Sequence, residues 1–162
     1  MNECVIPSPL GPVQIVTEHE RIIAVRFVAE AFASKQLMAT IAHSEVLTQA
    51  CEQLNRYFAG ELSEFDLPLA PQGTDFQRQV WQQLQRIPYG ATCSYQAVAA
   101  GINNPKAVRA VGLANSRNPI AIIIPCHRVI GANGHLTGYA GGLDKKTWLL
   151  NREGWQPGEQ GC

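Results

Sequence analysis

A stretch interrupted by proline and glycine divides the chain into two parts of opposite charge, and this division constrains the fold more than any other feature. Residues 61–73 contain Pro68, Pro71 and Gly73, which break regular helices and strands. Residues 1–73 hold 4 Lys or Arg against 9 Asp or Glu, whereas residues 74–155 hold 9 against 3. A chain of 162 residues can form two small domains docked on each other. We therefore expect one domain over residues 1–72 and a basic one over residues 73–162.

Composition excludes several classes of protein. Hydrophobic residues make up 46% of the chain and charged residues 16%, which is globular and not disordered. No stretch approaches the roughly 18 apolar residues of a membrane helix, and the N-terminus lacks the basic and apolar regions of a signal peptide. The 5 cysteines are scattered without a CxxC pair, as in proteins of a reducing compartment. We expect a cytoplasmic protein with no membrane partner.

The acidic part has the pattern of an α/β domain. Apolar residues alternate over 11–17 and again over 21–28, with a polar break at 18–20, which predicts a β-hairpin. Ser44 is placed to cap an amphipathic helix that ends at Gly60. The first domain is therefore predicted to hold an antiparallel sheet and a helix.

The basic part reads as mostly helical. Thr74 can cap a helix that ends before Pro88, and a short helix is expected after Ser94. A turn over residues 101–104 precedes a third helix, with Pro105 at its first position. This order is typical of a helix-turn-helix, and the local positive charge suits a polyanion such as DNA. The spacing alone also fits an ordinary helical hairpin.

The last third of the chain mixes short elements. Residues 120–124 form a continuous apolar run, which predicts a buried strand. Asn133-Gly134 predicts a hairpin turn between residues 129–130 and 136–139. Asp144 is expected to cap a final helix, which Gly154 ends.

Cys126 is the candidate nucleophile because it emerges from this apolar run next to a base and a cation. A thiol acts as a nucleophile only when it becomes a thiolate, and His127 or Arg128 could favour that form. Neighbouring side chains on a strand point to opposite faces, so the chain must leave strand geometry after Pro125, or a water must bridge the pair. Taken alone, the pair also fits an inert buried cysteine beside a surface histidine.

Several motifs occur together in one order around this pair. They are Ser94-Tyr95, residues 104–112 (NPKAVRAVG), Asn118-Pro119, residues 125–131 (PCHRVIG), residues 138–142 (GYAGG), residues 148–150 (WLL) and Glu153-Gly154. In this combination the chain resembles the O6-alkylguanine-DNA alkyltransferases, also called methylated-DNA–protein-cysteine methyltransferases. The resemblance is close over residues 74–155 and loose before them, through residues 9–12 and 57–60.

The resemblance implies a fold and an activity. The first domain would be ribonuclease-H-like and the second would carry the helix-turn-helix and the active site. The protein would repair double-stranded DNA by moving the alkyl group of O6-alkylguanine onto its own cysteine, with O4-alkylthymine left open as a second substrate. The base would be flipped out of the duplex, and each molecule would act once.

The resemblance also implies the catalytic residues. Cys126 would accept the alkyl group, activated through a water by His127, which Glu153 would orient. Asn118 would hydrogen-bond the active-site loops. Tyr95 would crowd a DNA phosphate and donate its proton to the departing guanine.

Further residues would bind the base and the DNA. Arg109, on a helix otherwise made of small residues, would fill the space that the flipped base leaves. The base pocket would be lined by Pro125, Val129, Tyr139 and Ala140, and the DNA backbone would contact Gln77, Gln96, Asn104 and Ala132. Ala132 and Ala140 stand where some family members have serine, so side-chain hydrogen bonds would be missing there. Gln77 and Gln96 could equally be ordinary surface residues.

No cofactor is required by this chemistry, and we expect a monomer. Some family members hold a structural zinc in the N-terminal part, but Cys4, His19, His43 and Cys51 include no closely spaced pair, so we expect no metal.

Three other functions compete. A Cys-His hydrolase would turn over an acyl substrate, a non-catalytic lesion-binding protein would lack the cysteine, and a transcription regulator would need a dimerisation element.

Overall fold

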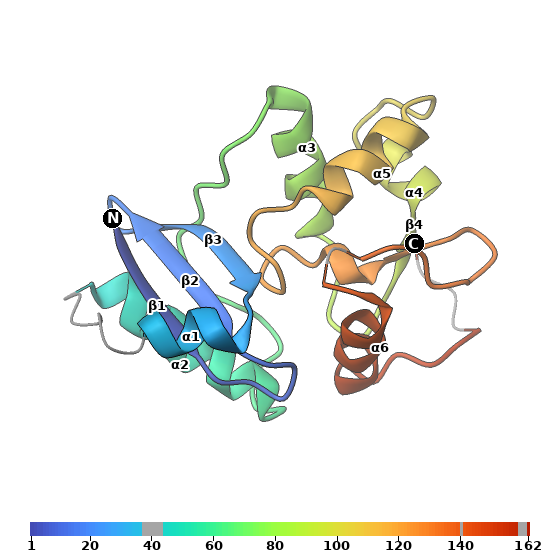
Figure 1. The fold of residues 1–162 in the computed structure, drawn as a ribbon. Helices are drawn as coiled ribbons and strands as arrows, with labels where there is room; N and C mark the ends of the chain where they lie inside the picture. The colour runs from blue at the N-terminus through green and yellow to red at the C-terminus, as the bar shows by residue number, and fades with distance from the viewer. Residues whose placement is uncertain (37–43, 140, 159–161) are drawn as a thin grey trace. The chain divides into compact units, whose positions relative to one another are not determined.

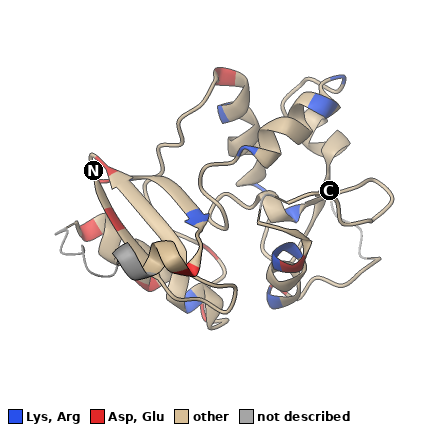
Figure 2. Cartoon of the chain, viewed as in Figure 1, with Lys and Arg blue, Asp and Glu red and all other residues tan. Residues whose placement is uncertain are grey.

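The structure, a computed structural model, describes residues 1–36, 44–139, 141–158 and 162 (Figure 1). The chain forms two compact units, of which unit 1 is residues 1–72 with 119–121 and unit 2 is residues 73–118 with 122–162. Figure 2, a cartoon coloured by residue type, shows acidic residues mostly in unit 1 and basic residues mostly in unit 2. The charge division of the sequence therefore follows the division into units.

Unit 1 is built on a three-stranded antiparallel sheet. Its strands are β1 (Asn2–Ile6), β2 (Val13–Glu18) and β3 (Arg21–Phe27), in the order β1-β2-β3. The predicted hairpin is confirmed, and its two turn residues, His19 and Glu20, both have positive φ, as a type I′ turn requires. The edge strand β1 was not predicted.

Helices α1 (Glu30–Gln36) and α2 (Glu45–Phe58) pack against this sheet. Ser44 caps α2 as predicted, because its hydroxyl accepts a hydrogen bond from the N–H of Leu47 at 3.2 Å. The α2 face that carries Leu47, Leu54 and Tyr57 is buried with the inward side chains of the sheet. The predicted α/β domain with an antiparallel sheet is thus what the structure contains.

The helical part of unit 2 contains α3 (Asp75–Leu84), α4 (Tyr95–Gly101) and α5 (Val108–Ser116), which pack on one another. Thr74 caps α3 and Ser94 caps α4, as their positions predict. The indole N–H of Trp81 in α3 donates to the carbonyl of Ala114 in α5 at 2.9 Å, which ties the two helices together.

The start predicted for α5 was wrong. Pro105 does not begin the helix, because the N–H of Ala107 bonds back to the carbonyl of Asn104 at 3.0 Å. Pro105 is then the second residue of a β-turn, a position that its fixed φ also favours. The helix begins only at Val108.

Residues 120–124 do not form the predicted strand. Ile120 makes a single bridge to Val25, after which residues 121–123 turn and Ile122 takes a φ of 73°. A β-branched residue rarely adopts that conformation, so the apolar run gave no warning of the turn. The run is buried, as predicted, but as an irregular segment.

The hairpin predicted around Asn133-Gly134 is only a turn. β5 (Val129–Ile130) pairs in parallel with β4 (Cys93–Ser94) and not with residues 136–139. The N–H of Gly131 still bonds to the carbonyl of His135 at 2.9 Å, so the chain reverses where the sequence indicates.

Helix α6 (Leu143–Arg152) closes unit 2. Its cap is Gly142, one residue before the helix, and Asp144 lies in the first turn instead of at the predicted cap. A carboxylate in the first turn still interacts favourably with the helix dipole. Gly154 ends the helix with a φ of 83°, as predicted, which leaves Glu153 as the last residue of the helix end.

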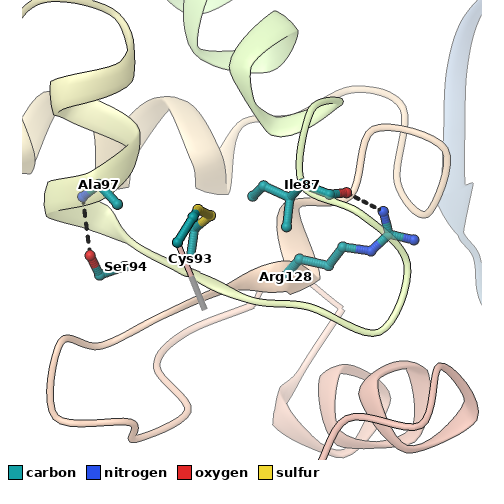
Figure 3. The surroundings of a disulfide bond; sticks show 6 residues. Ile87, Cys93, Ser94, Ala97 and Arg128 are labelled. Atoms are coloured by element: carbon teal, nitrogen blue, oxygen red, sulfur yellow. Dashed lines mark hydrogen bonds between the residues drawn. A yellow bond between two sulfur atoms is a disulfide. The ribbon is translucent and has the colours of Figure 1, made fainter. Parts of the chain in front are cut away.

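A disulfide joins Cys93 of β4 to Cys162, a pairing that the sequence analysis did not predict. Figure 3 shows its surroundings, where the hydroxyl of Ser94 accepts from the N–H of Ala97 and the guanidinium of Arg128 donates to the carbonyl of Ile87. Among the described residues, no helix is long and apolar enough to cross a membrane.

Candidate active site

The backbone bends sharply at Pro125, and the next turn carries two consecutive reactive residues, Cys126 and His127. Pro125 has φ −82° and ψ 65°, and the N–H of Cys126 bonds to the carbonyl of Ile124 at 2.8 Å, which is the geometry of an inverse γ-turn. Cys126–Arg128 then forms a single turn of 3-10 helix. Cys126 and His127 are therefore not in strand geometry, which is one of the two possibilities that the sequence analysis left open.

His127 is completely buried, and one of its ring nitrogens is bound to Glu153. Its Nε2 lies 2.7 Å from Oε2 of Glu153, which is placed there by the end of α6. Burial lowers the pKa of His127, and although the bond to Glu153 opposes this, the ring is neutral. A neutral ring that donates from Nε2 to a carboxylate carries its lone pair on Nδ1.

The other nitrogen of His127 is positioned to act as a base. Nδ1 is buried and has no hydrogen-bond partner among the described residues. A buried acceptor without a protein partner is uncommon, and a catalytic role is one of the explanations for it. The arrangement therefore provides an oriented, neutral histidine with a free acceptor.

Arg128 fixes Glu153 instead of facing the thiol. Its Nε donates to Oε1 of Glu153 at 2.7 Å, its Nη2 donates to Oε2 at 3.1 Å, and its Nη1 donates to the carbonyl of Ile87 at 2.7 Å. Burial alone would raise the pKa of Glu153, but His127 and Arg128 outweigh it and lower that pKa to about 2. Arg128 thus keeps the carboxylate charged for His127, and it is not the cation beside Cys126 that the sequence suggested.

The thiol of Cys126 is protonated in this structure. Only 5% of the residue is exposed, and burial raises the pKa of its thiol. The hydrogen bond from Asn118 and the charge of Lys146 oppose the effect of burial. Asn118 follows α5 and also donates to the carbonyl of Ile124 at 2.7 Å, so it joins that helix to the segment before Cys126.

Lys146 is a site residue that the sequence analysis missed. Its ammonium donates to the carbonyl of Val129 at 2.6 Å and to that of Thr137 at 3.0 Å, and burial lowers its pKa to about 8. Lys146 precedes Leu149 and Leu150 by three and four residues on α6, so it lies on the buried face of that helix. A lysine within an apolar helical stripe was the signal that could have revealed it.

A pocket of about 640 Å³ opens in unit 2, and residues 125–128 are not among those that line it. It is lined by Tyr95, Gln96, Val108, Gly112, Ser116, Gly131, Ala132, Thr137, Gly138 and Tyr139. Tyr139, one of the residues predicted for the base pocket, is among them, and burial raises the pKa of its phenol well above the usual value. Pro125 and Val129 are buried and are not among the lining residues. Ala140 lies outside the described residues.

Of the residues predicted to contact DNA, four are exposed, and Gln77 and Tyr95 make side-chain hydrogen bonds within the protein. Arg109 on α5, Gln96 on α4, Asn104 and Ala132 are exposed. Gln77 has a structural task, because its side chain accepts from the backbone N–H of Thr74 and completes the capping box of α3. Tyr95 begins α4, and its hydroxyl lies 2.8 Å from Oγ1 of Thr137, a contact that the sequence analysis did not foresee.

The structure gives no candidate metal site within the residues it describes, since no group of three or more His, Cys, Asp or Glu is close enough to hold an ion. His43, one of the side chains considered in the sequence for zinc, lies outside those residues.

Two family models cover the chain almost completely. The model described as "6-O-methylguanine DNA methyltransferase, DNA binding domain" matches residues 75–155. The model of the ribonuclease-like domain of the same protein matches residues 1–71. The chain belongs to the 6-O-methylguanine DNA methyltransferase family. The ribonuclease-like first domain and the helical DNA-binding second domain inferred from the sequence are those of this family.

Individual members of the 6-O-methylguanine DNA methyltransferase family match over nearly their full length. A methylated-DNA–protein-cysteine methyltransferase of Methanosarcina acetivorans is 51% identical over 95% of this chain and 99% of its own. The constitutive enzyme of Bacillus subtilis is 49% identical over 90% of this chain and 91% of its own. The crystal structure of the Mycobacterium tuberculosis protein in complex with DNA superposes with a TM-score of 0.82 at 46% identity, covering 94% of this chain and 92% of that one.

Proposed function

We propose that this protein is a methylated-DNA–protein-cysteine methyltransferase that repairs DNA by moving the alkyl group of O6-alkylguanine to Cys126. O4-alkylthymine is a candidate second substrate. Family membership, relatives of that name at about half identity and a related structure in complex with DNA support the assignment. The observation that carries it is the buried thiol of Cys126 beside a neutral His127 whose Nε2 is bound to Glu153.

The chemical step is an in-line displacement at the alkyl carbon. A water passes the thiol proton of Cys126 to Nδ1 of His127, and the imidazolium formed is stabilised by Glu153. The thiolate sulfur bonds to the alkyl carbon as the bond from that carbon to O6 breaks, which leaves the electron pair on the guanine. Asn118 and Lys146 stabilise the transient thiolate, and the Tyr95 hydroxyl donates a proton to the departing base.

Access to a base within a duplex requires flipping, which costs a few kcal/mol for unstacking. We assign the filling of the vacated space to Arg109, which is exposed on α5. Small neighbours on that helix, such as Ala110 and Gly112, let it approach a groove closely. The flipped base occupies the pocket beside Tyr139. Pro125, Val129 and Ala140 remain proposed base-binding residues, although Pro125 and Val129 do not line the pocket in this structure.

The two domains divide these tasks in our proposal. Residues 73–162 bind DNA and accept the alkyl group, and residues 1–72 contribute no catalytic residue. DNA backbone contacts are made by Tyr95, Gln96, Asn104, Gln77 and Ala132, of which Gln77 also caps α3. We further propose that the protein is a cytoplasmic monomer.

A stoichiometry experiment tests the proposed function. A thioether on Cys126 has no activated carbonyl that water could attack, so nothing regenerates the thiol and each molecule acts once. With excess methylated duplex, product reaches a plateau at one methyl group per protein, and peptide mapping finds that methyl on Cys126. Product that keeps accumulating would reject the mechanism and favour a hydrolase-like turnover. Label on Cys4 or Cys51 would reject Cys126 as the acceptor.

The matched control is Cys126→Ser, which keeps the size of the side chain. This variant transfers no alkyl group but still binds duplex DNA. The reason is that, among the described contacts, no hydrogen bond joins the side chain of Tyr95 or Arg109 to the Cys126 sulfur. Loss of binding together with transfer would show that the substitution acts on the fold, and circular dichroism separates that case.

A further inference from the structure

Unit 1 contains a second pair of cysteines that the alkyl-transfer reaction does not use. Cys4 lies on the edge strand β1, paired in register with Ile15 of β2, and Cys51 lies on α2, 47 residues further along the chain. Their Sγ atoms are 2.7 Å apart. That distance is only about 0.7 Å longer than the roughly 2.05 Å of a disulfide bond, so forming the bond requires little movement.

The two thiols differ in their surroundings. Cys4 is buried, whereas Cys51 is partly exposed to solvent. The hydrogen bond between them raises the pKa of the Cys4 thiol and lowers that of the Cys51 thiol, so Cys51 is the more acidic thiol of the pair. A more acidic, partly exposed thiol beside a buried one is the arrangement of an attacking and a resolving cysteine.

We propose that Cys4 and Cys51 form a redox-active dithiol that peroxides oxidise to a disulfide linking β1 to α2. The Cys51 sulfur attacks one oxygen of hydrogen peroxide, the O–O bond breaks, and the other oxygen leaves as water, which gives a sulfenic acid on Cys51. The Cys4 sulfur then attacks the Cys51 sulfur. The sulfenyl hydroxyl leaves with the Cys4 proton as a second water, so two thiols and one peroxide give one disulfide and two waters.

The cross-link has a mechanical consequence. β1 is the edge strand and, among the described residues, pairs with one strand only, β2. A covalent bond to α2 holds this strand to the helix as well, and closing a loop of this length restricts the unfolded chain. Oxidation therefore stabilises unit 1, while Cys126, with its buried protonated thiol in unit 2, stays reduced.

The experiment uses the full-length Cys93→Ser/Cys162→Ser protein, so that the disulfide of unit 2 does not contribute. After reduction and removal of the reductant, the protein is treated with hydrogen peroxide and mapped by mass spectrometry without reducing agent. We expect the mass to fall by two hydrogens, one cross-linked species that joins the Cys4 and Cys51 peptides, and complete reversal by a thiol reductant. The midpoint of thermal unfolding of unit 1 rises by about 5 °C or more.

Two single substitutions in the same background separate the roles of the two sulfurs. Cys4→Ser leaves a sulfenic acid on Cys51 that dimedone traps, whereas Cys51→Ser leaves Cys4 as an unreacted thiol. The proposal is overturned if both thiols of the unsubstituted pair stay open to maleimide after peroxide, or if dimedone labels Cys4 instead of Cys51. Alkyl transfer by the oxidised protein stays at one group per molecule, so a failure here is distinct from a failure of the proposed function.

Discussion

Glu153 and His127 are joined by a hydrogen bond of 2.7 Å, and neither side chain is exposed to solvent. The same carboxylate also receives two hydrogen bonds from Arg128. A carboxylate at the C-terminal end of a helix is unfavourable for the helix dipole, so α6 alone would not select an acid there. Glu153 is therefore held by its partners in the site, and its substitution should affect the chemistry directly.

Glu153→Gln should slow alkyl transfer by about tenfold to a hundredfold, because a neutral partner neither orients His127 nor stabilises its charged form. The apparent pKa of Cys126 in the pH–rate profile should rise. Single-turnover rates measured over a range of pH test both effects. Asp144→Asn, an exposed acid in the first turn of the same helix, is the control and should leave the profile unchanged. An identical profile for Glu153→Gln in a folded protein would leave Glu153 with a purely structural role.

The same carboxylate predicts how stability depends on acid. Its pKa falls from 4.5 in the unfolded chain to about 2 in the folded protein. A lowered pKa contributes stability that is complete above the unfolded value and is lost as pH falls toward the folded value. Urea unfolding at a series of pH values should show this loss below about pH 4.5 in the native protein. Glu153→Gln should show a smaller decline over that interval, and equal declines would contradict the shift.

Arg109→Ala should impair repair of duplex DNA far more than reaction with free O6-benzylguanine, because only the duplex needs its vacated stack filled. Arg117→Ala is the matched control, since Arg117 is an exposed arginine at the other end of α5. Arg117→Ala should weaken DNA binding only through the loss of one positive charge. Its reaction rates with duplex DNA and with free O6-benzylguanine should therefore both change little. Equal losses on the two substrates for Arg109→Ala would remove Arg109 from base flipping.

The disulfide of unit 2 should make the effects of substituting its two cysteines on the free energy of unfolding non-additive. Cys162→Ser and Cys93→Ser should each lower the free energy of unfolding by about 2–4 kcal/mol, since the bond closes a long loop. The double variant should lose no more than either single one, because each removes the same bond. Denaturant unfolding without reductant measures this, and additive losses would show that the two sulfurs act separately.

The features predicted correctly depend on residues close together in the sequence. Ser44, Thr74 and Ser94 cap their helices because a capping hydrogen bond reaches only two or three residues ahead. Gly154 ends α6 for the same local reason. The pairing of residues 129–130 with Cys93–Ser94 was missed because a distant segment decides it, which no turn signal could indicate. The start of α5 was missed for a local reason, because Pro105 suits the second position of a β-turn as well as the first turn of a helix.

The candidate site was accessible from the sequence to the extent that its residues lie within recognisable motifs. Cys126, His127 and Glu153 stand in such motifs, and the structure places the last two in hydrogen-bond contact. Lys146 could not be inferred in this way, because its importance comes from burial, and its bonds go to backbone carbonyls that any sequence would supply. The direction of the Cys126 pKa also required the structure, since burial outweighs its polar neighbours.

The burial of Cys126 protects its thiol from side reactions. Small electrophiles dissolved in the cell react with exposed thiolates, and a thiol that is protonated and 5% exposed offers them little. If each molecule acts once, as proposed above, every accidental reaction would use up a whole molecule. In the proposed mechanism, the Cys126 sulfur becomes reactive only when the alkylated nucleobase has entered the site. The single reaction of each molecule is thereby reserved for damaged DNA.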